Sequence, residues 1–128
     1  MELNGKVVLI TGGKRIGAVV ATTLAKAGVD VALVYNRSRA EADDTATAVR
    51  ELGRKAVTVQ ADVSSEQDCA QAVDATVAQL GRLDILINMA SLYGSKPFDK
   101  LSAADWDRQM SVDLRATFLF SRAAAIVM

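Results

Sequence analysis

Residues 7–17 read Val7-Val8-Leu9-Ile10-Thr11-Gly12-Gly13-Lys14-Arg15-Ile16-Gly17, an apolar run that passes through glycines into a helical pattern. The apolar residues predict a buried strand, and the glycines predict a tight turn that opens straight into a helix. Backbone N–H groups at the start of a helix are free to donate, and the helix dipole adds partial positive charge there. Glycine lets a phosphate approach the backbone, because a Cβ would stand in the way. The stretch therefore predicts a nucleotide phosphate site, although such turns also serve as plain connectors.

The composition fits a single domain. The chain has 128 residues, 51% of them hydrophobic, and its 15 acidic and 15 basic residues cancel. This balance argues against nucleic acid or an anionic membrane as a partner. The absence of histidine excludes His-based triads and most zinc sites, so we expect no metal. One cysteine, Cys69, allows no internal disulfide, and no segment resembles a membrane span or a secretion signal, so we expect a cytoplasmic protein.

Strand and helix patterns alternate along the chain. Nearly continuous apolar runs predict strands covered on both faces at Lys6–Thr11, Val29–Tyr35, Ala56–Ala61 and Leu83–Asn88. Helical patterns follow at Ile16–Ala27, Ala40–Leu52, Ser64–Leu80 and from Ser102 towards Met128. Because right-handed crossovers between parallel strands build a doubly wound sheet, we expect an α/β fold of the Rossmann type with strand order 3-2-1-4, filling residues 1–128 as one domain.

Apolar residues at helical spacing predict which side of each helix faces the core. The predicted stripes are Ile16, Val19, Val20, Leu24 and Ala27 in the first helix, Ala70, Val73, Val77 and Leu80 in the third, and Trp106, Met110, Leu114, Thr117, Phe118 and Ser121 in the last. Ser64 and Gln67 stand in capping-box positions at the start of the third helix. Gly28, Gly53 and Gly81 follow the helices as C-terminal caps.

Three motifs stand in order along the chain: the glycine turn, Asp62-Val63 after the third expected strand, and Asn88-Met89-Ala90-Ser91 after the fourth. In this order and spacing the whole chain resembles the N-terminal half of the short-chain dehydrogenases/reductases. Lys14-Arg15-Ile16-Gly17 and Tyr35-Asn36-Arg37-Ser38 are similar to the pteridine-reductase branch, which uses NADP(H). The resemblance implies an oxidoreductase that transfers a hydride to or from a small carbonyl, alcohol or pterin-like substrate. An unrelated α/β domain with chance matches is the alternative.

The chain departs from the family pattern in its motifs. Its first turn is one residue shorter, with Arg15 in place of a middle glycine. Met89 and Ser91 replace the second asparagine and the glycine of Asn-Asn-Ala-Gly, and Asp113 stands at the position of the catalytic asparagine. In the family, that asparagine holds a water through its main chain, and an aspartate can still do so. A helix-surface or interface acid is the alternative for Asp113.

The family's catalytic serine and its Tyr-x-x-x-Lys pair lie beyond the fourth strand. Neither Tyr35 nor Tyr93 has a lysine four residues on. We therefore expect the cofactor-binding part of a longer enzyme, truncated before a fifth strand, inactive by itself and prone to associate. A non-catalytic nucleotide-binding or regulatory module is the alternative.

Cofactor residues are expected where the strands end. NAD-selective folds place an acidic residue after the second strand, where it binds the ribose 2′-hydroxyl. Arg37 stands there in this chain and can bind a 2′-phosphate through two hydrogen bonds, and Arg15 approaches the same region from the first turn. The expected cofactor is therefore NADP(H). The resemblance assigns Asp62 to the adenine amino group, while a turn-forming aspartate is the alternative. The full expected set is Gly12, Arg15, Ile16, Gly17, Tyr35, Asn36, Arg37, Ser38, Asp62, Val63, Asn88, Ala90 and Ser91.

Two further expectations concern substrate and partners. Ser91 is positioned to contact cofactor or substrate. The resemblance implies that the long helix at residues 102–128 pairs subunits of a homo-oligomer, with Leu119 and Ala123 on its outer face. Cys69 is expected to be a packed, unreactive residue.

Overall fold

The computed structural model describes residues 1–12 and 14–128; Gly13, the second glycine of the first turn, lies outside them. Strands and helices alternate as predicted: β1 Val7–Thr11, α1 Ile16–Lys26, β2 Asp30–Tyr35, α2 Arg39–Glu51, β3 Ala56–Gln60, α3 Glu66–Leu80, β4 Ile85–Asn88, η1 Phe98–Lys100, α4 Ala103–Met110, η2 Ser111–Arg115 and α5 Ala116–Val127. The segment η1 is a 3₁₀ turn, and η2 is a π-helical stretch that joins α4 to α5. No helix in this described part of the chain is long and apolar enough to cross a membrane.

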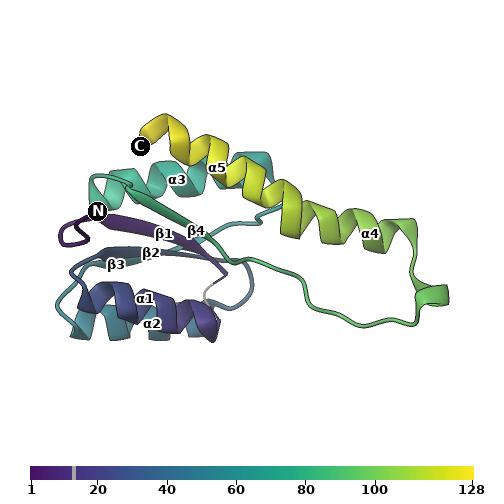
Figure 1. The fold of residues 1–128 in the computed structure, drawn as a ribbon, viewed down its shortest axis with the longest axis horizontal. Coiled ribbons are helices and arrows are strands. Elements are labelled where there is room, and N and C mark those ends of the chain that lie inside the picture. Colours follow the sequence, from purple (N-terminus) through teal and green to yellow (C-terminus); the bar gives the residue numbers. More distant parts are fainter. Residues whose placement is uncertain (13) are drawn as a thin grey trace.

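The described strands form one parallel sheet in the order β3-β2-β1-β4, which confirms the predicted topology. Strand β1 lies inside the sheet, with Val7 opposite Asp30 of β2 and Val8 opposite Ile85 of β4. Helices α1 and α2 cover one face of the sheet, and α3 and α5 cover the other (Figure 1). The chain builds outward from β1 through β2 to β3 and then crosses to β4 on the other side. This reversal creates a switch point beside β1, where α/β folds bind ligands.

Two hydrophobic cores lie on opposite sides of the sheet because side chains alternate along a strand. From β1 and β2, the core under α3 and α5 takes Leu9, Ala32 and Val34. The core under α1 and α2 takes Val8, Ile10, Val31 and Leu33. Burial on both faces explains why the strands read as continuous apolar runs.

The predicted core stripe of α1 is wrong in part. Ile16 and Val19 are 68% and 65% exposed, Ala27 is exposed, and Val20 and Leu24 only flank the core. The buried residues of α1 are Gly17, Ala21 and Ala25. These small residues, four apart, let the helix backbone lie close to the sheet, so the larger apolar side chains are displaced to the flanks.

The start of α3 is one residue later than predicted. Ser65 caps the helix by accepting from the N–H of Asp68, so the Ser64–Gln67 capping box is wrong. The predicted stripe is wrong at Ala70, which is exposed, but Val73 is buried and Val77 and Leu80 pack against the core as predicted. Cys69, Ala72 and Thr76 complete the core face. Gly81 ends the helix in a left-handed conformation, as predicted.

The last helix turns its predicted core stripe outward. Trp106, Leu114 and Phe118 are 65%, 66% and 59% exposed. The buried residues of α5 are Ala116, Leu119, Phe120 and Ala124. This helix has two apolar faces, and the one that carries Leu119 and Phe120 packs into the core beneath α3 and α5. The expectation that Leu119 and Ala123 face a partner subunit is therefore wrong, because Leu119 is buried and Ala123 packs against the core of this chain.

Candidate active site

A cleft of about 950 Å³ opens at the carboxyl ends of β1, β2 and β4. This volume is at the upper end of the range of roughly 300–1,000 Å³ for small-molecule and cofactor sites. Eleven of the thirteen expected cofactor residues line it: Gly12, Arg15, Ile16, Tyr35, Asn36, Arg37, Ser38, Asp62, Val63, Ala90 and Ser91. The other two lie outside the lining, Gly17 buried in α1 and Asn88 exposed at the end of β4.

Close packing within the protein requires glycine at positions 12 and 17. Gly12 has a φ of 77°, and a Cβ there would lie 2.6 Å from the backbone nitrogen of Ala90. A Cβ on Gly17 would lie 2.7 Å from the carbonyl oxygen of Gly12. The turn after β1, the start of α1 and the loop after β4 therefore meet without side chains between them.

Thr11 fixes the same junction from the end of β1. Its hydroxyl oxygen accepts hydrogen bonds from the N–H groups of Met89 and Ala90, at 3.1 and 3.2 Å, and the residue is buried. Sequence reasoning missed this residue. The available signal was a hydroxyl at the end of a fully apolar strand, since a buried hydroxyl needs a hydrogen-bond partner.

Arg15 occupies an unusual backbone conformation at the start of α1. Its φ is 44°, the only positive φ of a non-glycine residue in the described chain. Such a conformation favours glycine and costs an L-residue of order 1–3 kcal/mol. The arginine is held in this strained conformation while it lines the cleft.

Charged side chains of both signs surround the cleft. Lys14 and Glu41 form an ion pair at 4.0 Å. Asp62 accepts from the hydroxyl and the N–H of Ser64, at 2.7 and 2.9 Å, and these bonds, with a contribution from Arg37, hold the pKa of Asp62 below its usual value. Asp62 thus is an ionised carboxylate that closes the turn after β3, and it also lines the cleft. The turn-forming role is observed, and the adenine contact stays a prediction.

The loop after β4 forms one wall of the cleft and is tied to the helix that follows it. Leu92 donates its N–H to Oδ1 of Asp113 at 3.0 Å, and its carbonyl accepts from Nε2 of Gln109 at 2.8 Å. Gln109 also donates to Oδ2 of Asp113. Asp113 is therefore half-buried and bonded within the chain, in the π-helical segment. Segments of this kind frequently occur at functional sites.

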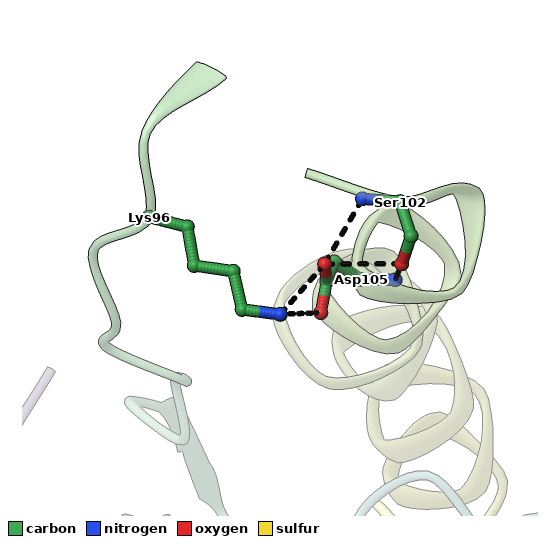
Figure 2. A network of polar contacts seen from close by, with 3 residues as sticks. All are labelled: Lys96, Ser102 and Asp105. Atoms are coloured by element: carbon green, nitrogen blue, oxygen red, sulfur yellow. Dashed lines mark hydrogen bonds and ion pairs between the residues drawn. The ribbon is translucent and has the colours of Figure 1, made fainter. Parts of the chain in front are cut away.

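A second set of polar contacts connects the same loop to the start of α4 (Figure 2). Lys96 contacts both carboxylate oxygens of Asp105 at 2.9 Å, and Asp105 closes a capping box with Ser102 at the start of α4. The Lys96 ammonium and the Ser102 donors lower the pKa of Asp105 to about 2. Sequence reasoning missed these ties, although Asp105, Gln109 and Asp113 stand four residues apart on one helix side.

Cys69 takes no part in the cleft. It is buried in α3, its thiol donates to the carbonyl of Val63 at 3.3 Å, and burial raises the pKa of the thiol to about 11. A thiol of this kind is almost fully protonated at neutral pH and is a packing residue.

Comparison with known proteins agrees with this geometry. The family model described as short chain dehydrogenase matches residues 6–128. An uncharacterized oxidoreductase of Methylorubrum extorquens is 38% identical over 125 residues, which cover 97% of this chain and 50% of that protein. The short-chain dehydrogenase/reductase homolog YusS of Bacillus subtilis is 40% identical over 108 residues, which cover 84% of this chain and 99% of that protein.

Solved structures resemble this chain in both fold and sequence. A short chain dehydrogenase from Burkholderia cenocepacia in complex with NADP is 38% identical, with a TM-score of 0.94 over 100% of this chain and 53% of the other. The chain thus spans about half the length of this structure and of the Methylorubrum relative. With the parallel sheet and the cleft at its switch point, the family match shows that the chain belongs to the short-chain dehydrogenase/reductase family.

Proposed function

We propose that these 128 residues bind NADP(H) for a reductase of the pteridine-reductase type, which transfers a hydride to or from a small carbonyl, alcohol or pterin-like substrate. This proposal rests on the cleft at the switch point, which Arg15 and Arg37 line. The Burkholderia relative was solved with NADP. When bound, the nicotinamide supplies the hydride chemistry, and the protein binds and orients it.

The residues present fit a phosphorylated dinucleotide. Gly12, Arg15 and Ile16 bring the start of α1 to the cleft, and the N-terminus of a helix favours negative charge. Arg15, Arg37 and Ser38 line the side of the cleft next to β2, where they can hold a 2′-phosphate through charge-assisted hydrogen bonds. Ser91 and the backbone at Ala90 line the opposite wall, next to β4, and can orient the nicotinamide half.

Proton transfer needs a donor that these residues do not contain. Position 39 is Arg39 and position 97 is Pro97, so neither Tyr35 nor Tyr93 begins a Tyr-x-x-x-Lys pair. A positioned general acid contributes roughly 10²–10⁴-fold to such reactions. We therefore assign binding and orientation to this chain and proton donation to groups outside it.

A nucleotide-binding module without catalysis is a second candidate. The Bacillus subtilis homolog favours it, because this chain covers 99% of that protein's length. The two candidates are separated by the mass of the protein isolated from its own cells. A mass near 13.6 kDa supports the module, and about twice that mass supports the reductase.

Cofactor choice is tested by calorimetry with NADPH and NADH. We expect NADPH to bind more tightly, and Arg37→Asp to weaken NADPH binding by roughly 1.5–3 kcal/mol, or about ten- to hundredfold in Kd. Arg39→Asp is the matched control, since it makes the same charge change two residues away, outside the cleft lining. Equal affinity of the unmodified chain for both nucleotides would refute the assignment.

We also propose that the chain forms a homo-oligomer through α4 and α5. Trp106, Leu114 and Phe118 expose large apolar side chains along one side, beside a groove of about 390 Å³. Burying such side chains is worth about 1.5–3 kcal/mol each. Sedimentation should show that Leu114→Glu shifts the chain towards monomer, whereas an unmodified chain that is already monomeric at tens of micromolar would rule the proposal out.

A further inference from the structure

Gln109 and Asp113 bind both backbone groups of a single residue, Leu92. The N–H of Leu92 donates to Asp113 at 3.0 Å, and the carbonyl of Leu92 accepts from Gln109 at 2.8 Å. Leu92 lies in the cleft lining between Ser91 and Tyr93. The pair therefore holds the cleft wall at one defined point.

The pair also closes a ring of hydrogen bonds in which every donor meets an acceptor. Asp113 accepts from Leu92 through Oδ1 and from Gln109 through Oδ2. Gln109 donates its amide N–H groups to the carbonyl oxygen of Leu92 and to Asp113. An ionised aspartate can fill this position because it only accepts, whereas an asparagine presents a donor on one side.

An asparagine at position 113 would break the ring in either orientation. Its amide nitrogen would face the N–H of Leu92 or the amide nitrogen of Gln109, a donor against a donor. Rotating Gln109 to offer its oxygen to that amide would turn the same oxygen towards the carbonyl of Leu92. An unpaired polar group in a half-buried position weakens the contact.

We propose that Gln109 and Asp113 act as a pair of positioning residues for the cleft wall, and that Gln109 makes aspartate the required residue at position 113. The family's asparagine, placed here, would impair the site instead of improving it. The effect on nucleotide binding rests on the proposed function, but the hydrogen-bond ring does not.

The test is a double-mutant cycle of Asp113→Asn, Gln109→Met and the combined variant. Methionine has nearly the length of glutamine and removes the opposing donor. Asp74→Asn, on an exposed site of α3, is the control for the loss of one charge. The hydrogen-exchange rate of the Leu92 amide in the nucleotide-free chain measures whether the hydrogen-bond ring is intact. The Kd for NADPH depends on both halves of the cleft, and the Kd for adenosine 2′,5′-bisphosphate depends on the adenosine half alone.

We expect Asp113→Asn to speed Leu92 exchange about tenfold and to raise the Kd for NADPH by about five- to tenfold, the scale of one net hydrogen bond. Adenosine 2′,5′-bisphosphate, which does not reach the nicotinamide wall, should change by less than about twofold. In the Gln109→Met background, Asp113→Asn should add less than about twofold to either quantity, because the opposing donor is gone.

The pairing is overturned if Asp113→Asn leaves Leu92 exchange unchanged, or if its effect is the same with and without Gln109. A uniform change in all amides would mark general destabilisation and would also overturn it. If the unmodified chain binds neither NADPH nor adenosine 2′,5′-bisphosphate, the proposed function fails, while Leu92 exchange still decides the role of the pair.

Discussion

Replacing Gly12 with alanine tests whether the junction between the first turn and the loop after β4 is as close as the structure shows. A Cβ on Gly12 would lie 2.6 Å from the backbone nitrogen of Ala90 and 2.7 Å from the Cα of the same residue. The contacts are backbone atoms, so no side chain can rotate away. The backbone must shift, which also strains the hydrogen bonds from Met89 and Ala90 to Thr11.

The magnitude has two parts. A left-handed φ, here 77°, costs an L-residue roughly 1–2 kcal/mol, of which about 0.4–1 kcal/mol is recovered because alanine restricts the unfolded chain. Forcing extra volume into a packed site costs about 1–3 kcal/mol more. We therefore expect Gly12→Ala to lower the free energy of unfolding by about 2–4 kcal/mol, a large share of the roughly 5–15 kcal/mol of a typical domain.

Gly53→Ala is the matched control. Gly53 has a φ of 81°, and apart from its two chain neighbours no heavy atom of the described residues lies within 4 Å of the Cβ it would gain. It therefore carries the conformational cost without the collision, and we expect a loss of about 1 kcal/mol or less. Urea unfolding followed by circular dichroism measures both variants. Equal losses for Gly12→Ala and Gly53→Ala would refute the close approach at the junction.

Two other predictions concern strain and pH. Arg15→Gly and Arg15→Ala both remove the guanidinium, but only glycine relieves the φ of 44°. After the entropy that glycine adds to the unfolded chain is subtracted, urea unfolding should find Arg15→Gly more stable than Arg15→Ala by about 1 kcal/mol. A less stable Arg15→Gly would contradict the strain at this position. Hydrogen bonds from Arg82 lower the pKa of Asp84, and the N–H of Val7 and the charge of Lys6 contribute. The ionised Asp84 therefore stabilises the folded chain fully above the ordinary pKa of 3.8, and this stabilisation is lost as the pH falls through the lower pKa of the folded state. Asp84→Asn should therefore be about 1–2 kcal/mol less stable than the unmodified chain between pH 7 and pH 5, and the difference should shrink below about pH 4; a difference that grows with acidification would contradict the sign.

Much of the cofactor side of the site could be predicted from the sequence because it depends on where strands end. Gly12, Arg37 and Asp62 each lie one or two residues after a strand, and carboxyl ends of parallel strands meet at one edge of a sheet. Their convergence on one cleft follows from the alternation of elements alone. On the other wall, Ala90 and Ser91 were predicted. The contacts of Leu92 with Gln109 and Asp113 were not, because these residues meet across a long loop whose path no periodicity specifies.

The sequence alone determined the strand order and the position of the phosphate turn. Continuous apolar runs, helical spacing and glycines are local patterns that predict the elements, and the right-handed crossover rule then orders the strands. Only the tertiary structure decided which helix faces are buried. In α1 the core takes Ala21 and Ala25 and leaves Val19 exposed, because only small residues fit where the helix lies close to the sheet. In the last helix it takes Leu119 and Phe120 and leaves Leu114 and Phe118 exposed, so hydrophobicity alone does not distinguish the two sides. The rotation of each helix and its distance from the sheet are properties of the assembled layers and are not encoded in any single segment.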